Sequence, residues 1–169
     1  MALEIIIPRG ITNIHDAWQD PITVKVLKEL SENKQLPIRV YGMLGSSHPK
    51  LLKQFFKDGH VNSNNYSIRS VKAFIDGALG SRGAALLEPY TDDKNSCGLV
   101  LISADEFKDL AKHCRDADFQ LCTHAIGDRG NRVVLDIYSD VIQNRKNHRW
   151  RIEHAQMLCD EDIPRFARA

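Results

Sequence analysis

The chain has 169 residues, of which 43% are hydrophobic and 27% are charged. This is ordinary globular composition, so intrinsic disorder is not expected. The formal net charge is +1, with acidic and basic residues interspersed. This balance gives no electrostatic reason to expect nucleic acid or an anionic membrane as a partner. We therefore expect a small-molecule partner.

The cysteines and the apolar runs bear on the cellular compartment. Four widely spaced cysteines form no CxxC pair, so we expect reduced thiols: Cys97, Cys114, Cys122 and Cys159. The apolar runs fall short of the roughly 18 residues that span a bilayer, and the opening segment lacks the features of a signal peptide. A cytoplasmic protein is the prediction.

The first half of the chain alternates between strand and helix patterns. Residues 11–15 are rich in β-branched side chains and predict a buried strand. Helical spacing of apolar residues predicts helices over 21–34 and 49–57. Apolar runs predict two further strands over 38–44 and 66–75.

The second half opens with a long segment over 76–101 that is punctuated by glycines. Its length is typical of a functional loop. Ser103 and Glu106 form a capping-box pattern and predict the start of a helix. Three further elements follow, a strand over 119–124, a helix over 127–141 and a strand over 150–154, before a last helical start at Asp160.

Five predicted strands therefore alternate with helices. Such alternation is typical of βαβ units with parallel strands and right-handed crossovers. The predicted class is α/β. A closed TIM barrel needs eight strands, so the architecture is either open or part of a barrel.

Three side chains that can bind metal end strands: Lys72, His124 and His154. The carboxyl ends of parallel barrel strands meet at one end of the barrel, so these side chains can converge there. Neutral imidazoles suit zinc, whereas a lysine amine must first lose its proton. A deprotonated Lys72 could react with carbon dioxide and form a carbamate, which supplies oxygen ligands.

Other interpretations of the same residues stay open. A strand-end histidine is often satisfied by hydrogen bonds alone, and Lys72 could form a buried ion pair with Asp76. Asp76, Arg82 and Asp128 lie in predicted turns, where they could bind substrate or only hold loops. His15 could orient a neighbouring group and is not assigned a role.

Four segments together resemble the amidohydrolase superfamily, specifically the branch with N-substituted formamide deformylases. They are GITNIHD (10–16), VKAFIDGALGSRGAALLEPY (71–90), HAIGDRGNR (124–132) and RIEHAQ (151–156). The resemblance extends over nearly the whole chain. Its most specific part is the glycine- and arginine-containing loop that begins at Asp76.

The resemblance implies a metal-dependent hydrolase that cleaves amide-like, non-peptide C–N bonds by attack of metal-activated water on a carbonyl. It implies that Lys72 is carboxylated by carbon dioxide and bridges two divalent ions, for which zinc is expected. His124 and His154 would hold one of these ions. No catalytic residue is assigned apart from these metal ligands, and the candidates for substrate binding are Asp76, Arg82 and Asp128.

The chain departs from the family pattern because it lacks the HxH pair of the first barrel strand and the aspartate of the last. Residues 1–169 are therefore expected to be the central segment of the catalytic domain, from strand two to strand six. This makes a partial TIM-like (β/α)8 barrel, incomplete at both ends, with impaired activity.

One alternative is a non-catalytic fragment or oligomerising module, whose exposed sheet edges pair with another copy. A flavodoxin-like ligand-binding protein would fit the alternation of strands and helices, but not the loop or the histidines.

Overall fold

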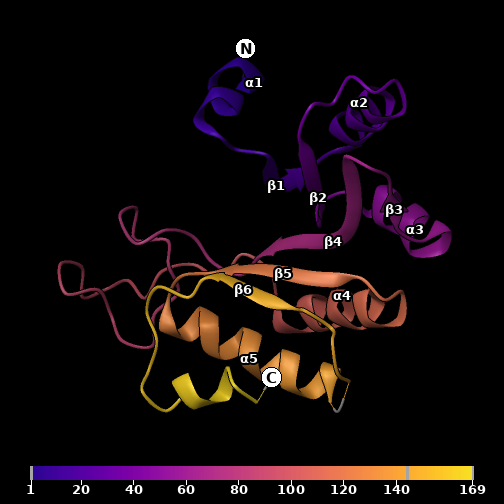
Figure 1. Ribbon diagram of the computed structural model, residues 1–169. Coiled ribbons are helices and arrows are strands. Elements are labelled where there is room, and N and C mark those ends of the chain that lie inside the picture. The colour runs from indigo at the N-terminus through magenta and orange to yellow at the C-terminus, as the bar shows by residue number, and fades with distance from the viewer. Residues whose placement is uncertain (1, 144, 169) are drawn as a thin grey trace. The chain divides into compact units, whose positions relative to one another are not determined.

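The computed structural model describes residues 2–143 and 145–168. In it, strands alternate with helices along the chain (Figure 1). The chain forms two compact units, one ending at Lys72 and the other beginning at Ala73. The strands are β1 (Asn13–Gln19), β2 (Arg39–Gly45), β3 (Val61–Asn62), β4 (Tyr66–Phe74), β5 (Gln120–Ala125) and β6 (Arg151–His154). The α-helices are α1 (Ala2–Ile6), α2 (Pro21–Glu32), α3 (Pro49–Asp58), α4 (Ala104–Asp116) and α5 (Asp128–Ile142), and the 3-10 helices are η1 (Ile7–Arg9) and η2 (Ile163–Arg165).

The first unit contains a parallel sheet in the order β1-β2-β4, with β3 antiparallel to β4. Asp20 caps α2, because its carboxylate accepts the Thr23 amide N–H at 2.7 Å. Gly59 ends α3 with a φ of 87°. The predicted helices and the second and third predicted strands are confirmed within a few residues. The two-residue strand β3 is too short to leave a periodic pattern in the sequence.

The predicted burial of the first strand is wrong. Residues 11–15 were expected to be buried, whereas β1 begins at Asn13, and most of its side chains, including His15, are exposed. Among the described strands of this unit, β1 pairs with β2 on one side and so lies at the edge of the sheet. A composition rich in β-branched residues predicts a strand, but burial of its side chains depends on what packs against the strand.

A buried polar chain joins β1 to β4 within the first unit. The Tyr66 hydroxyl donates to Gln19 Oε1 at 2.6 Å, and Gln19 Nε2 donates to Asp16 Oδ2 at 2.8 Å. Tyr66 and Gln19 are both almost fully buried, and burial raises the pKa of Tyr66. A Cβ atom at Gly42 would lie 2.2 Å from Gln19 Oε1. Glycine therefore leaves room for the Gln19 amide where β2 passes it.

Substituting Tyr66→Phe is expected to lower the free energy of unfolding by about 1–2 kcal/mol, because it leaves the buried Gln19 carbonyl oxygen without its donor. Chemical denaturation would measure the change. A double-mutant cycle with Gln19→Ala isolates the contribution of the hydrogen bond. A coupling energy of zero would contradict the bond.

The second unit contains the parallel pair β5 and β6, with α4 and α5 against one face of these strands (Figure 1). The predicted capping box of α4 is confirmed, since the Glu106 amide donates to Ser103 Oγ and the Ser103 amide donates to Glu106 Oε2. The strands and helices predicted in this half are confirmed. The helical start predicted at Asp160 is instead the short 3-10 helix η2.

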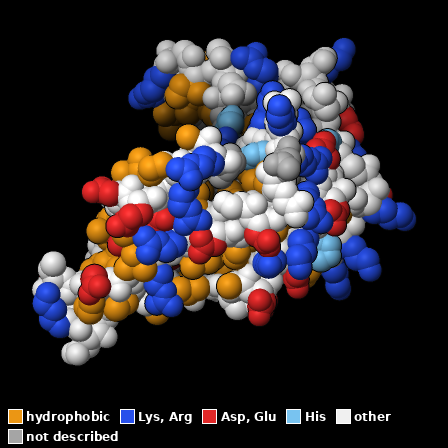
Figure 2. Space-filling model, turned by 90° about the horizontal axis from the view of Figure 1, so that it is seen from below, with side chains coloured by type: hydrophobic (Ala, Val, Ile, Leu, Met, Phe, Trp, Pro, Cys, Tyr) orange, Lys and Arg blue, Asp and Glu red, His pale blue; other side chains and the backbone are white. Residues whose placement is uncertain are grey.

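The predicted class is confirmed: parallel strands alternate with helices in an α/β fold that corresponds to part of a TIM-like barrel. Lys and Arg side chains are interspersed with Asp and Glu side chains on the face drawn in Figure 2. Within residues 2–143 and 145–168, no helix is long and apolar enough to cross a membrane.

Candidate metal centre

Two of the three predicted ligands lie together in the second unit. Ala125, at the end of β5, is in register with His154, at the end of β6, and His124 precedes Ala125. The ring centroids of His124 and His154 are 4.6 Å apart, and their planes make an angle of 72°. His124 is 8% exposed and His154 is exposed. The parallel register of β5 and β6 thus brings the two imidazoles side by side.

The chain leaves β6 at His154 with an unusual backbone conformation. His154 has a φ of 76° and Ala155 a φ of 43°, both in the left-handed region that L-residues seldom adopt. The Ala155 amide donates to the Ala125 carbonyl at 3.1 Å and holds this turn against the end of β5. Such strain is concentrated at functional sites.

Asp76 lies next to His124 and is fully buried. Its carboxylate accepts three backbone N–H groups, from Ala85 at 3.0 Å, Ile126 at 3.0 Å and Gly127 at 2.8 Å. His124 Nε2 is 3.4 Å from Asp76 Oδ1. One carboxylate therefore holds the long loop, the turn after β5 and a candidate ligand together.

The predicted loop over 76–101 is present and is closely packed against its surroundings. A Cβ atom at Gly127 would lie 1.9 Å from the Ala85 carbonyl oxygen, and one at Gly98 would lie 1.9 Å from that of Ala84. Gly98 also has a φ of 78°. The turn after β5 therefore approaches the loop backbone so closely that only glycine fits.

Lys72 lies near the end of β4 and is the last residue of the first unit. It is paired in register with Gly45 of β2, and its carbonyl oxygen accepts the Ser46 amide at 2.9 Å. The side chain is buried, with 4% exposed. Lys72 thus has the burial expected for a ligand, and its convergence with the two histidines stays a prediction.

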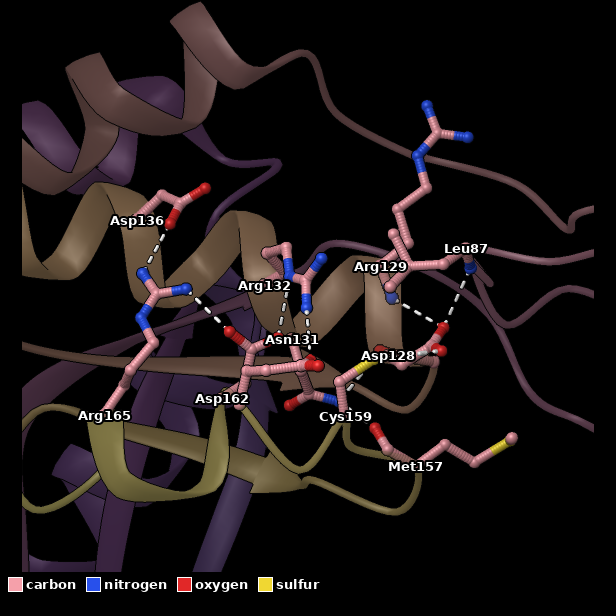
Figure 3. Close-up of polar contacts among 12 residues, drawn as sticks. Leu87, Asp128, Arg129, Asn131, Arg132, Asp136, Met157, Cys159, Asp162 and Arg165 are labelled. Atoms are coloured by element: carbon pink, nitrogen blue, oxygen red, sulfur yellow. Dashed lines mark hydrogen bonds and ion pairs between the residues drawn. The ribbon is translucent and has the colours of Figure 1, made fainter.

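The residues predicted to bind substrate have partners within the second unit. Arg82 donates to Asp92 through Nε at 3.3 Å and Nη2 at 3.1 Å, and these bonds raise the pKa of Arg82. Asp128 accepts the amides of Leu87 at 2.9 Å and Arg129 at 2.8 Å (Figure 3). Their role in substrate binding, like that of Asp76, stays a prediction.

Asn131 is a residue whose role sequence reasoning missed. It is fully buried on α5, and its Nδ2 donates to the carbonyls of Gly127 at 2.9 Å and Met157 at 3.1 Å (Figure 3). It therefore ties the turn after β5 to the segment after β6. Its sequence signal is an amide on the otherwise apolar face of a predicted helix.

Ion pairs around Asp162 also hold the chain beyond β6 against α5. Arg132 Nε and Arg165 Nη1 each lie 2.8 Å from the carboxylate of Asp162, which is buried, and Arg165 also pairs with Asp136 (Figure 3). Burial acts to raise the pKa of Asp162, but the hydrogen bonds from the two arginines outweigh it. They hold the pKa below the ordinary aspartate value of 3.8.

Asp162 therefore stabilises the folded chain above the ordinary pKa of 3.8, and this contribution is lost as the pH falls through its lowered folded-state pKa. Asp162→Asn is expected to lower the melting temperature at pH 7 by roughly 2–4 °C, with a smaller difference near pH 3. Melting curves across this range would check it. A deficit that does not depend on pH would contradict the assignment.

A cavity of about 360 Å³ lies between the long loop and the segments that follow β5 and β6. Its wall is partly apolar and includes two acidic residues. The lining residues are Leu79, Leu86, Pro89, Met157, Tyr90, Thr91, Glu88 and Asp128. The long loop and the segments after β5 and β6 therefore border an open pocket of the size that small-molecule sites have.

The donor set limits how a metal could be held. Within the described ranges 2–143 and 145–168, no three His, Cys, Asp or Glu side chains are grouped as a metal site. The His124 and His154 pair supplies two imidazoles, which are preferred zinc ligands. A further ligand has to be of another type or come from outside the described residues.

Parallel strands that alternate with helices, with two histidines at the ends of neighbouring strands, define an α/β-barrel type of protein with a candidate metal centre. Residues 8–169 match the amidohydrolase family, and the chain belongs to this family.

Several relatives are similar to the chain. Protein LONG AFTER FAR-RED 3 of Arabidopsis thaliana is 30% identical over 94% of the chain and 29% of its own length. The putative amidohydrolase YtcJ of Bacillus subtilis is 36% identical over 59% of the chain and 18% of its own length. The structure of an uncharacterized metal-dependent hydrolase from Pyrococcus furiosus superimposes on the chain with a TM-score of 0.85. It is 28% identical, and the match covers 99% of the chain and 34% of the hydrolase. The chain thus spans about a third of the length of the Arabidopsis and Pyrococcus proteins.

Proposed function

We propose that the chain forms part of a metal-dependent hydrolase that cleaves amide-like, non-peptide C–N bonds of small molecules. The observation that carries the proposal is the pair of imidazoles, 4.6 Å apart, at the ends of β5 and β6. Membership in the amidohydrolase family and the likeness to a metal-dependent hydrolase support it. We further propose that the chain belongs to the branch with N-substituted formamide deformylases, on the basis of the sequence resemblance.

In this proposal His124 and His154 bind a divalent ion, for which zinc is expected, and Lys72 joins them as a carbamate formed with carbon dioxide. When bound, such an ion polarises a carbonyl group and activates water. The chain's own residues orient the ligands. His124 Nε2 faces Asp76 and the Gly77 carbonyl oxygen, so a neutral His124 ring would carry its proton on Nε2 and its lone pair on Nδ1.

The cavity beside the long loop supports a small substrate with an apolar part. Four apolar side chains line it together with the carboxylates of Glu88 and Asp128. Such a wall favours neutral or cationic groups over anionic ones. Asp128 would contact the substrate here, and Arg82 of the same loop, which does not line the pocket, would donate to a carbonyl group of the substrate.

We expect the chain to bind at most about one zinc ion, and we expect His124→Gln and His154→Gln each to weaken binding at least about tenfold. Isothermal titration of the metal-free chain with zinc in bicarbonate buffer would measure this. His113→Gln is the matched control, since this exposed histidine lies on α4, outside the candidate centre.

The carbamate has its own readout. With ¹³C-labelled bicarbonate, a carbamate resonance is expected in the zinc-loaded chain and is expected to be absent from Lys72→Arg. If the folded chain binds no zinc after reconstitution with bicarbonate, the metal-centre proposal is wrong. If it binds zinc without the resonance, the lysine part alone is wrong.

A second candidate is a non-catalytic, oligomerising module. Leu99 and Leu101, at the end of the long loop, are 60% and 57% exposed, and Val100 between them is also exposed. Apolar side chains exposed in a row favour association with another copy. Sedimentation analysis of the chain would separate the candidates, since a stable oligomer without zinc binding supports this one.

A further inference from the structure

The surroundings of His124 Nε2 determine which ring nitrogen carries the proton. This nitrogen lies 3.4 Å from Asp76 Oδ1 and 3.3 Å from the Gly77 carbonyl oxygen. A carboxylate and a carbonyl oxygen accept hydrogen bonds and cannot donate them. An Nε2 lone pair would face two oxygen atoms. The protonated Nε2 is therefore the stable arrangement, and in a neutral imidazole the lone pair is then on Nδ1.

We propose that Asp76 is a positioning residue that fixes His124 as the Nε2–H tautomer and so presents Nδ1 as the metal-binding atom. The inference rests on the proposed metal centre, and it assigns Asp76 to His124 rather than to the substrate. A hydrogen bond from the second ring nitrogen to a carboxylate or backbone carbonyl is how proteins orient metal-binding histidines.

The carboxylate can do this because it is itself held rigidly. Ala85 and Gly127 donate to Oδ2, and Ile126 donates to Oδ1, the oxygen that faces His124. Asp76 is fully buried, so water does not compete for these bonds. Charge-assisted hydrogen bonds of this kind are among the strongest in proteins.

Helix α5 closes the remaining side of the carboxylate. A Cβ atom at Gly130 would lie 2.7 Å from Asp76 Oδ2 and 3.2 Å from Ile75 Cγ2. Gly130 is buried in the first turns of α5, where alanine would otherwise favour the helix. The glycine therefore leaves room for the carboxylate at some cost to helix propensity.

The same carboxylate couples the long loop to the histidine. The Ala85 amide belongs to the loop over 76–101, and Gly77, which supplies the second acceptor for His124, begins it. The Gly77 amide in turn donates to the Gly83 carbonyl at 2.9 Å. Order in this loop and the tautomer of His124 thus depend on one set of hydrogen bonds.

Asp76→Asn tests the inference because it keeps the shape of the side chain. Two amides, from Ala85 and Gly127, should hold the asparagine oxygen at the Oδ2 position. The asparagine NH₂ group then replaces Oδ1 and donates toward His124 Nε2. We expect His124 to change to the Nδ1–H tautomer.

The tautomer is read from ¹⁵N shifts of the imidazole in the metal-free chain at mildly alkaline pH. His124→Gln assigns the resonance among the seven histidines. In the same variant, we expect zinc affinity to fall about 10–100-fold, which is typical when the partner of a metal-binding histidine is lost.

Two further variants separate positioning from general stability. Gly130→Ala keeps the charge of Asp76 but displaces the carboxylate, and it is expected to populate both tautomers and weaken zinc binding. Asp162→Asn removes another buried carboxylate from the same unit, and it is expected to lower stability without a change in the tautomer. Circular dichroism and melting curves would establish that each variant folds.

Each outcome bears on the inference. An Nε2–H tautomer that persists in folded Asp76→Asn or Gly130→Ala, with unchanged zinc affinity, overturns it, and Gly130→Ala decides alone if Asp76→Asn fails to fold. A starting protein with the Nδ1–H tautomer also overturns it. If the tautomer changes as expected but the unaltered chain binds no zinc, the positioning of His124 stands and the proposed metal function fails.

Discussion

The second unit depends on the buried carboxylate of Asp76. A charged group removed from water is costly unless its hydrogen-bonding capacity is met, and here three backbone N–H groups meet it. Those N–H groups come from segments far apart in the sequence, the long loop and the turn between β5 and α5. Without the carboxylate, all three would be buried donors without an acceptor. The charge and the amides therefore stabilise each other, and together they place His124.

The candidate metal centre follows from this arrangement and from the register of two strands. Parallel pairing of β5 with β6 places His124 and His154 at neighbouring strand ends, although thirty residues separate them in the chain. Asn131 and the ion pairs around Asp162 then tie the segment after β6 to α5 (Figure 3). The site thus consists of a few side chains on strand ends, held from behind by polar contacts. Family membership agrees with such a site.

Local signals in the sequence predicted most of the fold. Apolar periodicity located the helices, and the Ser103 and Glu106 pair marked the start of α4, because these patterns act over a few residues. The exposure of β1 could not be predicted, since it depends on what packs against the strand and not on its composition. The short strand β3 left no periodic signal.

The candidate site was only partly accessible to the same reasoning. His124 and His154 could be predicted as partners because parallel strands end together. The three amide donors to Asp76 could not, since they come from backbone groups brought together by the folded loop. From the sequence alone, Asp76 is therefore a candidate for substrate binding. Asn131 was hidden on the apolar face of a predicted helix, and its acceptors include the Met157 carbonyl 26 positions away.

The glycine contacts between the long loop and α5 have a consequence for how this part of the molecule can vary. Gly127 approaches the Ala85 carbonyl, and Gly130 approaches the Asp76 carboxylate, at distances that leave no room for a methyl group. The loop and the first turn of α5 are thus shaped as a matched pair. If the loop were replaced by that of a relative to alter specificity, the first turn of α5 would have to be replaced with it. The segments that must be exchanged together are therefore separate in the sequence.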